Sequence, residues 1–248
     1  EETLSQRGMK IMKSSQVAAF NGDEMLKQIR VDDAGYDAEL CIIAAGRSPS
    51  VEYLPSGIAC DPRLGIMTDD AMRTTDMNIF AAGDCAVTKS SIDGKPIPVK
   101  LATSSFNQGV AAAYQIAGRG GKFRGSTGTF VSVIGGIEIA ATGFNSVSAA
   151  ERGFDPVSVK ISSSVRPDYM KPDDRITIKV IADRKTSRII GGQAIGNGAS
   201  ARINIVGSGI MMNATTDDFE SLEMAYCPAV SEVYDPLRRA VDGLKRRM

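Results

Sequence analysis

The chain has 248 residues, of which 43% are hydrophobic and 23% are charged, so it holds enough apolar material for one large globular domain or two smaller ones. This composition excludes intrinsic disorder, a collagen-like repeat and a disulfide-stapled miniprotein. Lys plus Arg and Asp plus Glu both number 29, a balance that favours neither nucleic acid nor an anionic membrane as a partner. No apolar run approaches the roughly 20 residues of a membrane span. We therefore expect a soluble protein whose partners are small molecules or other protein chains.

Histidine is absent, which removes the usual general acid–base and the commonest transition-metal ligand. Any chemistry must come from a cofactor, a carboxylate, a tyrosine, a thiol or another polypeptide. The first residues lack a starting Met and the pattern of a secretory signal. We expect buried thiols in a reducing cytoplasm, because the four cysteines lack metal-type or redox-type spacing. They are Cys41, Cys60, Cys85 and Cys227.

Residues 1–47 are predicted to form short strands joined by polar turns. The strands are expected at residues 6–12, 15–20 and 29–31, with no helix before them. Residues 38–45 form an apolar run that ends at a glycine and has the pattern of a buried strand. Because a parallel or mixed sheet requires an earlier βαβ unit, this region indicates a sheet that the sequence enters late.

Residues 50–120 hold turns, a predicted strand at 78–82 and an Ala-rich helix at 101–117. Glycines at 118, 120 and 121 are expected to stop that helix and to mark a domain boundary.

The remaining residues predict an α+β module. A hairpin of residues 129–134 and 137–142 turns at Gly135 and Gly136. A short helix is expected at 146–152, strands at 157–162, 175–182 and 189–195, and helices at 201–213, 217–223 and 235–247.

The end of the predicted strand at 78–82 is the best candidate for a binding point. In open α/β sheets ligands bind beyond the carboxyl ends of strands, where Asp84 is expected. Gly83 allows a close backbone approach, and an ionised Asp84 can only accept hydrogen bonds, as a polyol hydroxyl requires. From the spacing alone, an ordinary strand followed by a turn remains the alternative.

Two segments resemble motifs of the pyridine nucleotide-disulfide oxidoreductase family. The run TTDMNIFAAGDC at 74–85 resembles its second flavin-binding motif. The run CIIAAGRSPS at 41–50 resembles the Ala-x-Gly-Arg-x-Pro-Asn segment that leads from the NAD(P)H domain back to the FAD domain, with Ser50 replacing the usual Asn.

The resemblance implies an α/β fold with remnants of ββα three-layer nucleotide-binding domains followed by an α+β interface domain. Residues 1–47 correspond to the C-terminal part of the NAD(P)H-binding domain and 48–120 to the second part of the FAD-binding domain. Residues 121–248 correspond to the dimerisation domain.

The same resemblance implies the cofactor contacts. Asp84 would accept a hydrogen bond from the FAD ribitol, with Gly83 allowing the approach and Thr75 lying on a supporting strand at 74–82. The helix that begins near Leu101, Ala102 and Thr103 would direct its N-terminus at the pyrimidine side of the flavin and raise its reduction potential modestly. A core helix that packs its alanines on the sheet is a compatible role for this segment.

A C-terminal segment carries the catalytic candidate. Residues 225–237 resemble the Tyr-x-Pro-Pro-Phe/Val-Ser segment of NADH oxidases and coenzyme A-disulfide reductases, with Ala229 in place of the second proline. The absence of histidine excludes the branch that carries a His-Pro acid–base pair here. In the resembled branch the tyrosine reaches the partner subunit's flavin and redox cysteine, so Tyr226 is expected to contact the cofactor and to donate its O–H to a thiolate or substrate. An interface aromatic without chemistry is the alternative.

Two weaker matches remain near this segment. Tyr169 fits a second family tyrosine, although Met170 stands where relatives often repeat the tyrosine. A basic C-terminal tail has residues suited to a coenzyme A phosphate, but cations are favoured at a helix C-terminus in any case. The tail residues are Arg238, Arg239, Lys245, Arg246 and Arg247.

The sequence lacks the family's two Gly-x-Gly-x-x-Gly nucleotide loops and the redox cysteine between them. We therefore expect the C-terminal portion of an FAD-dependent NAD(P)H oxidoreductase of about twice the length, inactive alone. It would pair as a homodimer through residues 121–248 and meet an N-terminal half of the same protein or a separate subunit. A non-catalytic dimerisation module or split subunit is the competing hypothesis. NADH versus NADPH, and oxygen, coenzyme A disulfide or sulfur as acceptor, stay open.

Overall fold

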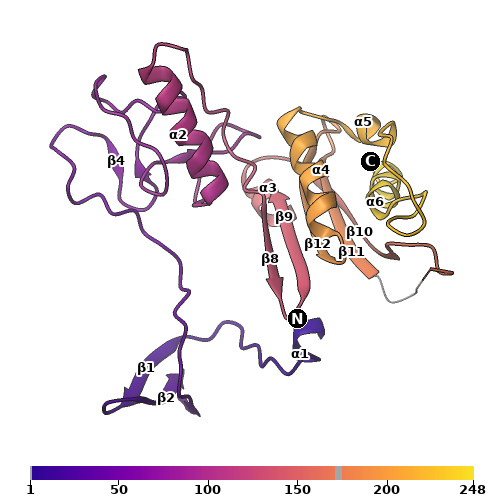
Figure 1. Cartoon of the computed structure of the whole chain (residues 1–248), viewed down its shortest axis with the longest axis horizontal. Helices are drawn as coiled ribbons and strands as arrows, with labels where there is room; N and C mark the ends of the chain where they lie inside the picture. Colours follow the sequence, from indigo (N-terminus) through magenta and orange to yellow (C-terminus); the bar gives the residue numbers. More distant parts are fainter. Residues whose placement is uncertain (1, 171–174) are drawn as a thin grey trace. The chain divides into compact units, whose positions relative to one another are not determined.

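The computed structural model describes residues 2–170 and 175–248 (Figure 1). The chain divides into two compact units, Glu1–Arg47 and Ser48–Met248. Among the described residues, no helix has both the length and the apolar character needed to cross a membrane.

The first unit is an antiparallel meander. A single helical turn, α1 (Glu2–Ser5), precedes strands β1 (Val17–Gly22), β2 (Leu26–Val31) and β3 (Ala34–Asp37), which pair in the order β1-β2-β3. The predicted strand at 6–12 is wrong, as is the prediction that no helix precedes the strands. The strand expected at 15–20 begins two residues later.

The prediction of a buried strand at 38–45 is also wrong. Leu40, Ile42 and Ile43 are 78%, 82% and 74% exposed, and the segment pairs with no described strand. A strand becomes buried only where strands flank it and another layer covers its faces. The described part of this unit offers only an antiparallel meander and one helical turn, so these side chains stay uncovered.

The second unit begins with short pairings around one long helix. Strands β4 (Cys60–Asp61) and β5 (Gly65–Ile66) pair, as do β6 (Thr88–Lys89) and β7 (Pro96–Ile97), and α2 (Ala102–Ile116) follows. The predicted helix at 101–117 is thus confirmed to within one residue at each end. A small apolar core joins the helix to the loops that precede it, and it comprises Ile66, Met72, Ala81, Ala86, Ala111 and Ala112.

The predicted strand at 78–82, which was also expected to support the site as residues 74–82, is wrong. Among the described residues, its only strand-type pairing is an isolated bridge between Arg73 and Phe80. Met72 has a positive φ of 64°, and the Asp76 carboxylate accepts the backbone N–H of Asn78 at 2.9 Å. These features close a tight turn within a few residues, so no regular strand extends towards Asp84.

The segment around Asp84 is nevertheless fixed by β5. The backbone N–H of Ile66 donates to the Cys85 carbonyl at 2.7 Å, and the N–H of Val87 donates to the Ile66 carbonyl at 2.9 Å. Gly65 has a φ of +107°, and a Cβ there would lie 2.1 Å from the Cys85 carbonyl oxygen. Only glycine therefore permits this close crossing of the two segments.

A five-stranded antiparallel sheet dominates the C-terminal half, in the order β10-β11-β12-β9-β8. Its strands are β8 (Phe130–Ile134), β9 (Ile137–Gly143), β10 (Pro156–Ser164), β11 (Arg175–Asp183) and β12 (Ile189–Gly196). The helices are α3 (Ser146–Glu151), α4 (Ala199–Met211), α5 (Thr216–Glu220) and α6 (Pro236–Lys245). The predicted hairpin, strands and helices are confirmed, with helix ends displaced by at most three residues.

The two long helices of this half cover the same face of the sheet (Figure 1). Val159 of β10 stands beside Val180 of β11, which stands beside Gly192 of β12, so all three share one face. Gly192 lies against Val206 of α4, and Val159 lies against Gly243 of α6. The main apolar core fills the space between this face and the helices.

The prediction that the four cysteine side chains are buried is wrong. Cys227 is exposed, and Cys41, Cys60 and Cys85 are half-buried. All four are free thiols. Within the described ranges, no cluster of cysteine and carboxylate side chains has the composition of a metal site.

Candidate functional site

Two bonds attach the Gly83–Asp84 turn to helix α2. The backbone N–H of Gly83 donates to the Gln108 side-chain oxygen at 2.8 Å, and the Ser105 hydroxyl donates to Asp84 Oδ1 at 3.1 Å. Gly83 has a φ of +91°, in the region that favours glycine. The half-buried Asp84 carboxylate is therefore held beside the first turns of α2.

Gln108 is the buried anchor of this arrangement. It is 1% exposed, and its amide nitrogen donates to the Thr88 hydroxyl at 3.2 Å while its oxygen accepts from Gly83. Because both ends of the amide are bonded, its orientation is fixed. The turn, β6 and α2 thus form one hydrogen-bonded unit.

The N-terminus of α2 is open to an external acceptor. Leu101 is the N-cap and supplies no side-chain bond to the first turn, which contains no acidic residue. The leading N–H groups of a helix lack intrahelical partners and carry the positive end of its dipole. Just before the cap, Lys100 Nζ donates to the carbonyls of Leu64 and Ala86 at 2.7 and 3.0 Å.

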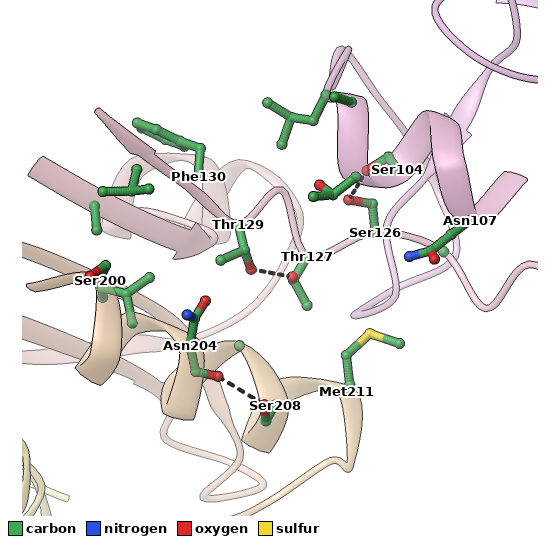
Figure 2. Close-up of a pocket in the computed structure, with 18 of the residues that line it drawn as sticks. Ser104, Asn107, Ser126, Thr127, Thr129, Phe130, Ser200, Asn204, Ser208 and Met211 are labelled. Atoms are coloured by element: carbon green, nitrogen blue, oxygen red, sulfur yellow. Dashed lines mark hydrogen bonds between the residues drawn. The ribbon is translucent and has the colours of Figure 1, made fainter. Parts of the chain in front are cut away.

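A cavity of about 650 Å³ lies between the N-terminal turns of α2, residues 123–131 and α4 (Figure 2). Its polar lining is uncharged, and hydrogen bonds join Ser104 to Ser126 and Thr127 to Thr129. The complete lining is Leu101, Ala102, Thr103, Ser104, Asn107, Phe123, Gly125, Ser126, Thr127, Thr129, Phe130, Val131, Ala140, Ser200, Ile203, Asn204, Gly207, Ser208 and Met211. A wall of hydroxyls, amides and apolar groups suits a neutral ring system better than an ion.

The structure brings three of the seven predicted cofactor residues to this cavity, and the other four, Thr75, Gly83, Asp84 and Tyr226, are not part of its lining. Leu101, Ala102 and Thr103 line the wall. The Thr75 hydroxyl instead donates to the Gly57 carbonyl at 2.9 Å and accepts the N–H of Ala59 at 3.1 Å. Thr75 therefore fixes a neighbouring loop, and a cofactor contact from it stays a prediction.

The two candidate tyrosines meet. Tyr226 is 47% exposed and Tyr169 is 77% exposed. Partial desolvation, followed by a hydrogen bond with Tyr169, raises the pKa of Tyr226 above its ordinary value. The Tyr226 phenol is therefore neutral, and available as a donor, across the physiological range.

The loop that carries Tyr226 is closed on itself. The buried Ser231 hydroxyl donates to the Ala225 carbonyl at 3.1 Å, and the N–H groups of Val230 and Ser231 both donate to the Cys227 carbonyl at 2.8 Å. After the loop, the Asp235 carboxylate forms a buried ion pair with Arg202 of α4. The loop is thus anchored to the sheet domain at its C-terminal end.

Two family models match this chain and together cover most of it. Residues 1–115 match the family model described as pyridine nucleotide-disulphide oxidoreductase, and residues 130–238 match the model of the dimerisation domain of the same family. The chain belongs to the pyridine nucleotide-disulphide oxidoreductase family. The predicted recognition and fold class are therefore confirmed.

Curated relatives within the family are oxidoreductases. The chain is 33% identical over 219 residues to an NAD(P)H coenzyme A polysulfide/persulfide reductase of Pyrococcus horikoshii, an alignment covering 88% of this chain and 49% of that protein. It is 29% identical over 248 residues to an NADH oxidase of Methanocaldococcus jannaschii, covering 99% of this chain and 55% of that protein. The chain spans about half the length of these relatives.

A solved structure in the family shows the same architecture. The NAD-dependent persulfide reductase from A. fulgidus is 27% identical and superimposes with a TM-score of 0.93, covering 100% of this chain and 46% of that one.

Sequence reasoning missed the side chains that hold the site together. Ser105 and Gln108 lie three residues apart, on one face of α2, and bind consecutive residues of the turn. Their polarity within an Ala-rich helix was the available signal. The contact between Tyr169 and Tyr226 was also missed, because 57 positions separate them in the sequence.

Proposed function

We propose that this chain forms the flavin-facing and dimer-forming part of an FAD-dependent NAD(P)H oxidoreductase. A hydride would pass from NAD(P)H to FAD, and electrons would then pass to a cysteine-linked disulfide, a sulfur species or oxygen. The named relatives act in these classes, as persulfide reductases and NADH oxidases.

The observation that carries the proposal is the Gly83–Asp84 turn bonded to the first turns of α2. It combines a carboxylate acceptor with a helix end whose N–H groups lack a side-chain cap. A ribitol hydroxyl needs the first group, and the electron-rich pyrimidine edge of a flavin needs the second. The residues present therefore fit FAD.

When bound, FAD supplies the two-electron chemistry. Asp84 accepts from the ribitol, and a Cβ at Gly83 would have only Ser105 atoms near it, at 3.9 Å, so the turn leaves room for close approach. The N–H groups after Leu101 stabilise negative charge at the pyrimidine edge by roughly 0.3–2 kcal/mol. Gln108 holds the Gly83–Asp84 turn beside helix α2 by accepting the Gly83 N–H.

Tyr226 is the proposed donor to a thiolate or substrate. Its raised pKa keeps its proton in place near neutral pH, and Tyr169 supports that neutral form through their hydrogen bond. In this proposal Tyr226 serves the flavin and redox cysteine of the partner subunit. Substitution of Tyr226 by phenylalanine would lower turnover of the acceptor while leaving FAD in place.

The test of the cofactor site is the FAD content and affinity of the protein as isolated from its source, compared among wild type, Asp84→Ala and Asp76→Ala. Asp76 is the matched control because it is an exposed aspartate of the same segment. We expect Asp84→Ala to weaken FAD binding at least about tenfold, since a hydrogen bond to a charged group is worth about 1.5–3 kcal/mol. Wild-type affinity in Asp84→Ala, or wild-type protein without FAD, would overturn the proposal.

The remaining partner predictions also stand as proposals. The match of residues 130–238 to a dimerisation domain supports a homodimer through 121–248. An N-terminal half of the same protein, or a separate subunit, would supply the two nucleotide loops that residues 1–248 lack. The four free thiols support a reducing, cytoplasmic location.

A further inference from the structure

A half-buried lysine links the two features that were assigned to the flavin. Lys100 directly precedes Leu101, the N-cap of α2. Its Nζ donates to the carbonyls of Leu64 and Ala86 at 2.7 and 3.0 Å. Ala86 lies two residues beyond the Gly83–Asp84 turn. The lysine side chain therefore connects the start of α2 to the segment that follows this turn.

Both acceptor carbonyls belong to backbone that is itself hydrogen-bonded. Ala86 is completely buried, and its N–H donates to the Gly83 carbonyl at 3.0 Å. The N–H of Leu64 donates to the Asp61 carboxylate at 2.8 Å. A lysine side chain has much rotamer freedom to lose, and two charge-assisted bonds to fixed acceptors restrict it. The Lys100 ammonium thus has a defined position in the folded chain.

The two printed bonds orient the ammonium without cancelling its charge, because a carbonyl oxygen is a neutral acceptor. Water and salt also screen a partly buried charge less than an exposed one. The potentials of separate charges add. Removing the Lys100 charge therefore changes the potential at a nearby site with the same sign, whatever other charged groups surround it.

We propose that the Lys100 ammonium raises the reduction potential of the bound FAD. This inference rests on the proposed FAD site. Reduction places negative charge at the pyrimidine edge of a flavin, so a positive charge nearby stabilises the reduced form more than the oxidised form. The N–H groups at the start of α2 act in the same direction. Lys100 differs from them because it is a full charge that a single substitution removes.

The chain bounds the distance over which this charge acts. The Cα atoms of Ala86 and Asp84 are at most about 7.6 Å apart, and Lys100 Nζ lies 3.0 Å from the Ala86 carbonyl oxygen. The ammonium is therefore within roughly 13 Å of the Asp84 Cα. At about 10 Å and an effective dielectric constant of about 20, one charge changes the ratio of reduced to oxidised flavin by roughly tenfold.

A purely structural role for Lys100 predicts a different result. In that role the side chain only ties the carbonyls of Leu64 and Ala86 to the start of α2, so a neutral donor would serve equally well. Lys100→Gln keeps N–H donors and removes the charge, whereas Lys100→Arg keeps both. Lys100→Met keeps an unbranched chain with neither. Together these variants separate the charge from the hydrogen bonds.

The test is the midpoint reduction potential of the FAD bound to the protein, measured by spectral titration against a dye of known potential. Lys95→Gln is the matched control, because Lys95 is an exposed lysine just before β7. We expect Lys100→Gln and Lys100→Met to lower the two-electron potential by about 30 mV, the equivalent of a tenfold change in the ratio of reduced to oxidised flavin. Lys100→Arg and Lys95→Gln should stay within about twofold of the wild-type ratio.

The affinities for the two forms of FAD give a second reading. By linkage, Lys100→Gln should weaken binding of reduced FAD about tenfold more than binding of oxidised FAD. An unchanged potential in a neutral variant that binds FAD, or an equal shift in Lys100→Arg, would overturn the inference. Loss of oxidised FAD from both neutral variants but not from Lys100→Arg would also overturn it, because Lys100 would then serve binding. Wild-type protein without FAD would instead overturn the proposed function itself.

Discussion

The buried ion pair between Arg202 and Asp235 provides a quantitative test of how the Tyr226 loop is anchored. The two side chains are 7% and 4% exposed, and Arg202 donates to Asp235 Oδ2 at 2.7 and 3.2 Å. Asp235 also caps α6, accepting the N–H of Leu237 at 2.8 Å. One carboxylate thus serves two functions at the junction of α4 and α6.

We predict that Asp235→Ala lowers the free energy of unfolding by at least about 4 kcal/mol. Removing one partner of a buried pair costs about 3–5 kcal/mol because the other charge stays desolvated. Loss of the helix cap adds about 1 kcal/mol. The double variant Arg202→Met with Asp235→Leu removes both charges, so it should be less destabilised than Asp235→Ala, retaining mainly the cap loss.

The assay is urea unfolding of wild type, Arg202→Met, Asp235→Leu and the double variant, with Asp235→Ala measured beside them. Asp23→Ala, which removes an exposed pair with Lys27, is the control and should cost under about 1 kcal/mol. A loss below about 1 kcal/mol in Asp235→Ala, or single-variant costs that simply add in the double variant, would refute the reasoning. Either result would mean that the pair is not desolvated as a unit.

Three further outcomes are expected. Tyr169→Phe should lower the pKa of Tyr226 towards its ordinary value, as measured by tyrosinate absorbance with Tyr226→Phe as the reference. Because the pKa of Tyr226 is higher in the folded than in the unfolded chain, its contribution to stability is present below about pH 10 and is lost as pH rises through the raised pKa. Thr75→Val should cost about 1–2 kcal/mol in urea unfolding, since it removes two bonds to residues 57–59. Gly65→Ala should unfold at distinctly lower temperature in calorimetry, because its Cβ would meet the Cys85 carbonyl at 2.1 Å; an unchanged Tm would contradict the crossing described.

The segments that the sequence predicted well carry local signals. The pair Gly135–Gly136 specifies a tight hairpin because both positions need positive φ, and α2 follows from its run of good helix formers. Such signals act within a few residues of one another. They can therefore be recognised in the sequence without knowledge of the rest of the fold.

The partners of the Gly83–Asp84 turn could not be recognised in the same way. Its importance followed from a motif, but Ser105 and Gln108 lie more than 20 positions away and act through single hydrogen bonds. Lys100 likewise binds two backbone carbonyls, those of Leu64 and Ala86, which sequence does not mark. Contacts between a side chain and a distant backbone depend on the folded path, and a periodic pattern does not encode that path.

The wrong strand at 38–45 and the exposed strand β8 have a common physical explanation. Both segments are apolar in the way of buried strands, yet Ile42 is 82% exposed and Val133 is 66% exposed. The hydrophobic effect rewards removal of apolar surface from water and does not depend on which polypeptide covers it. A sequence pattern therefore predicts that a segment favours burial, but it does not identify which part of the protein, or which other polypeptide, covers that segment.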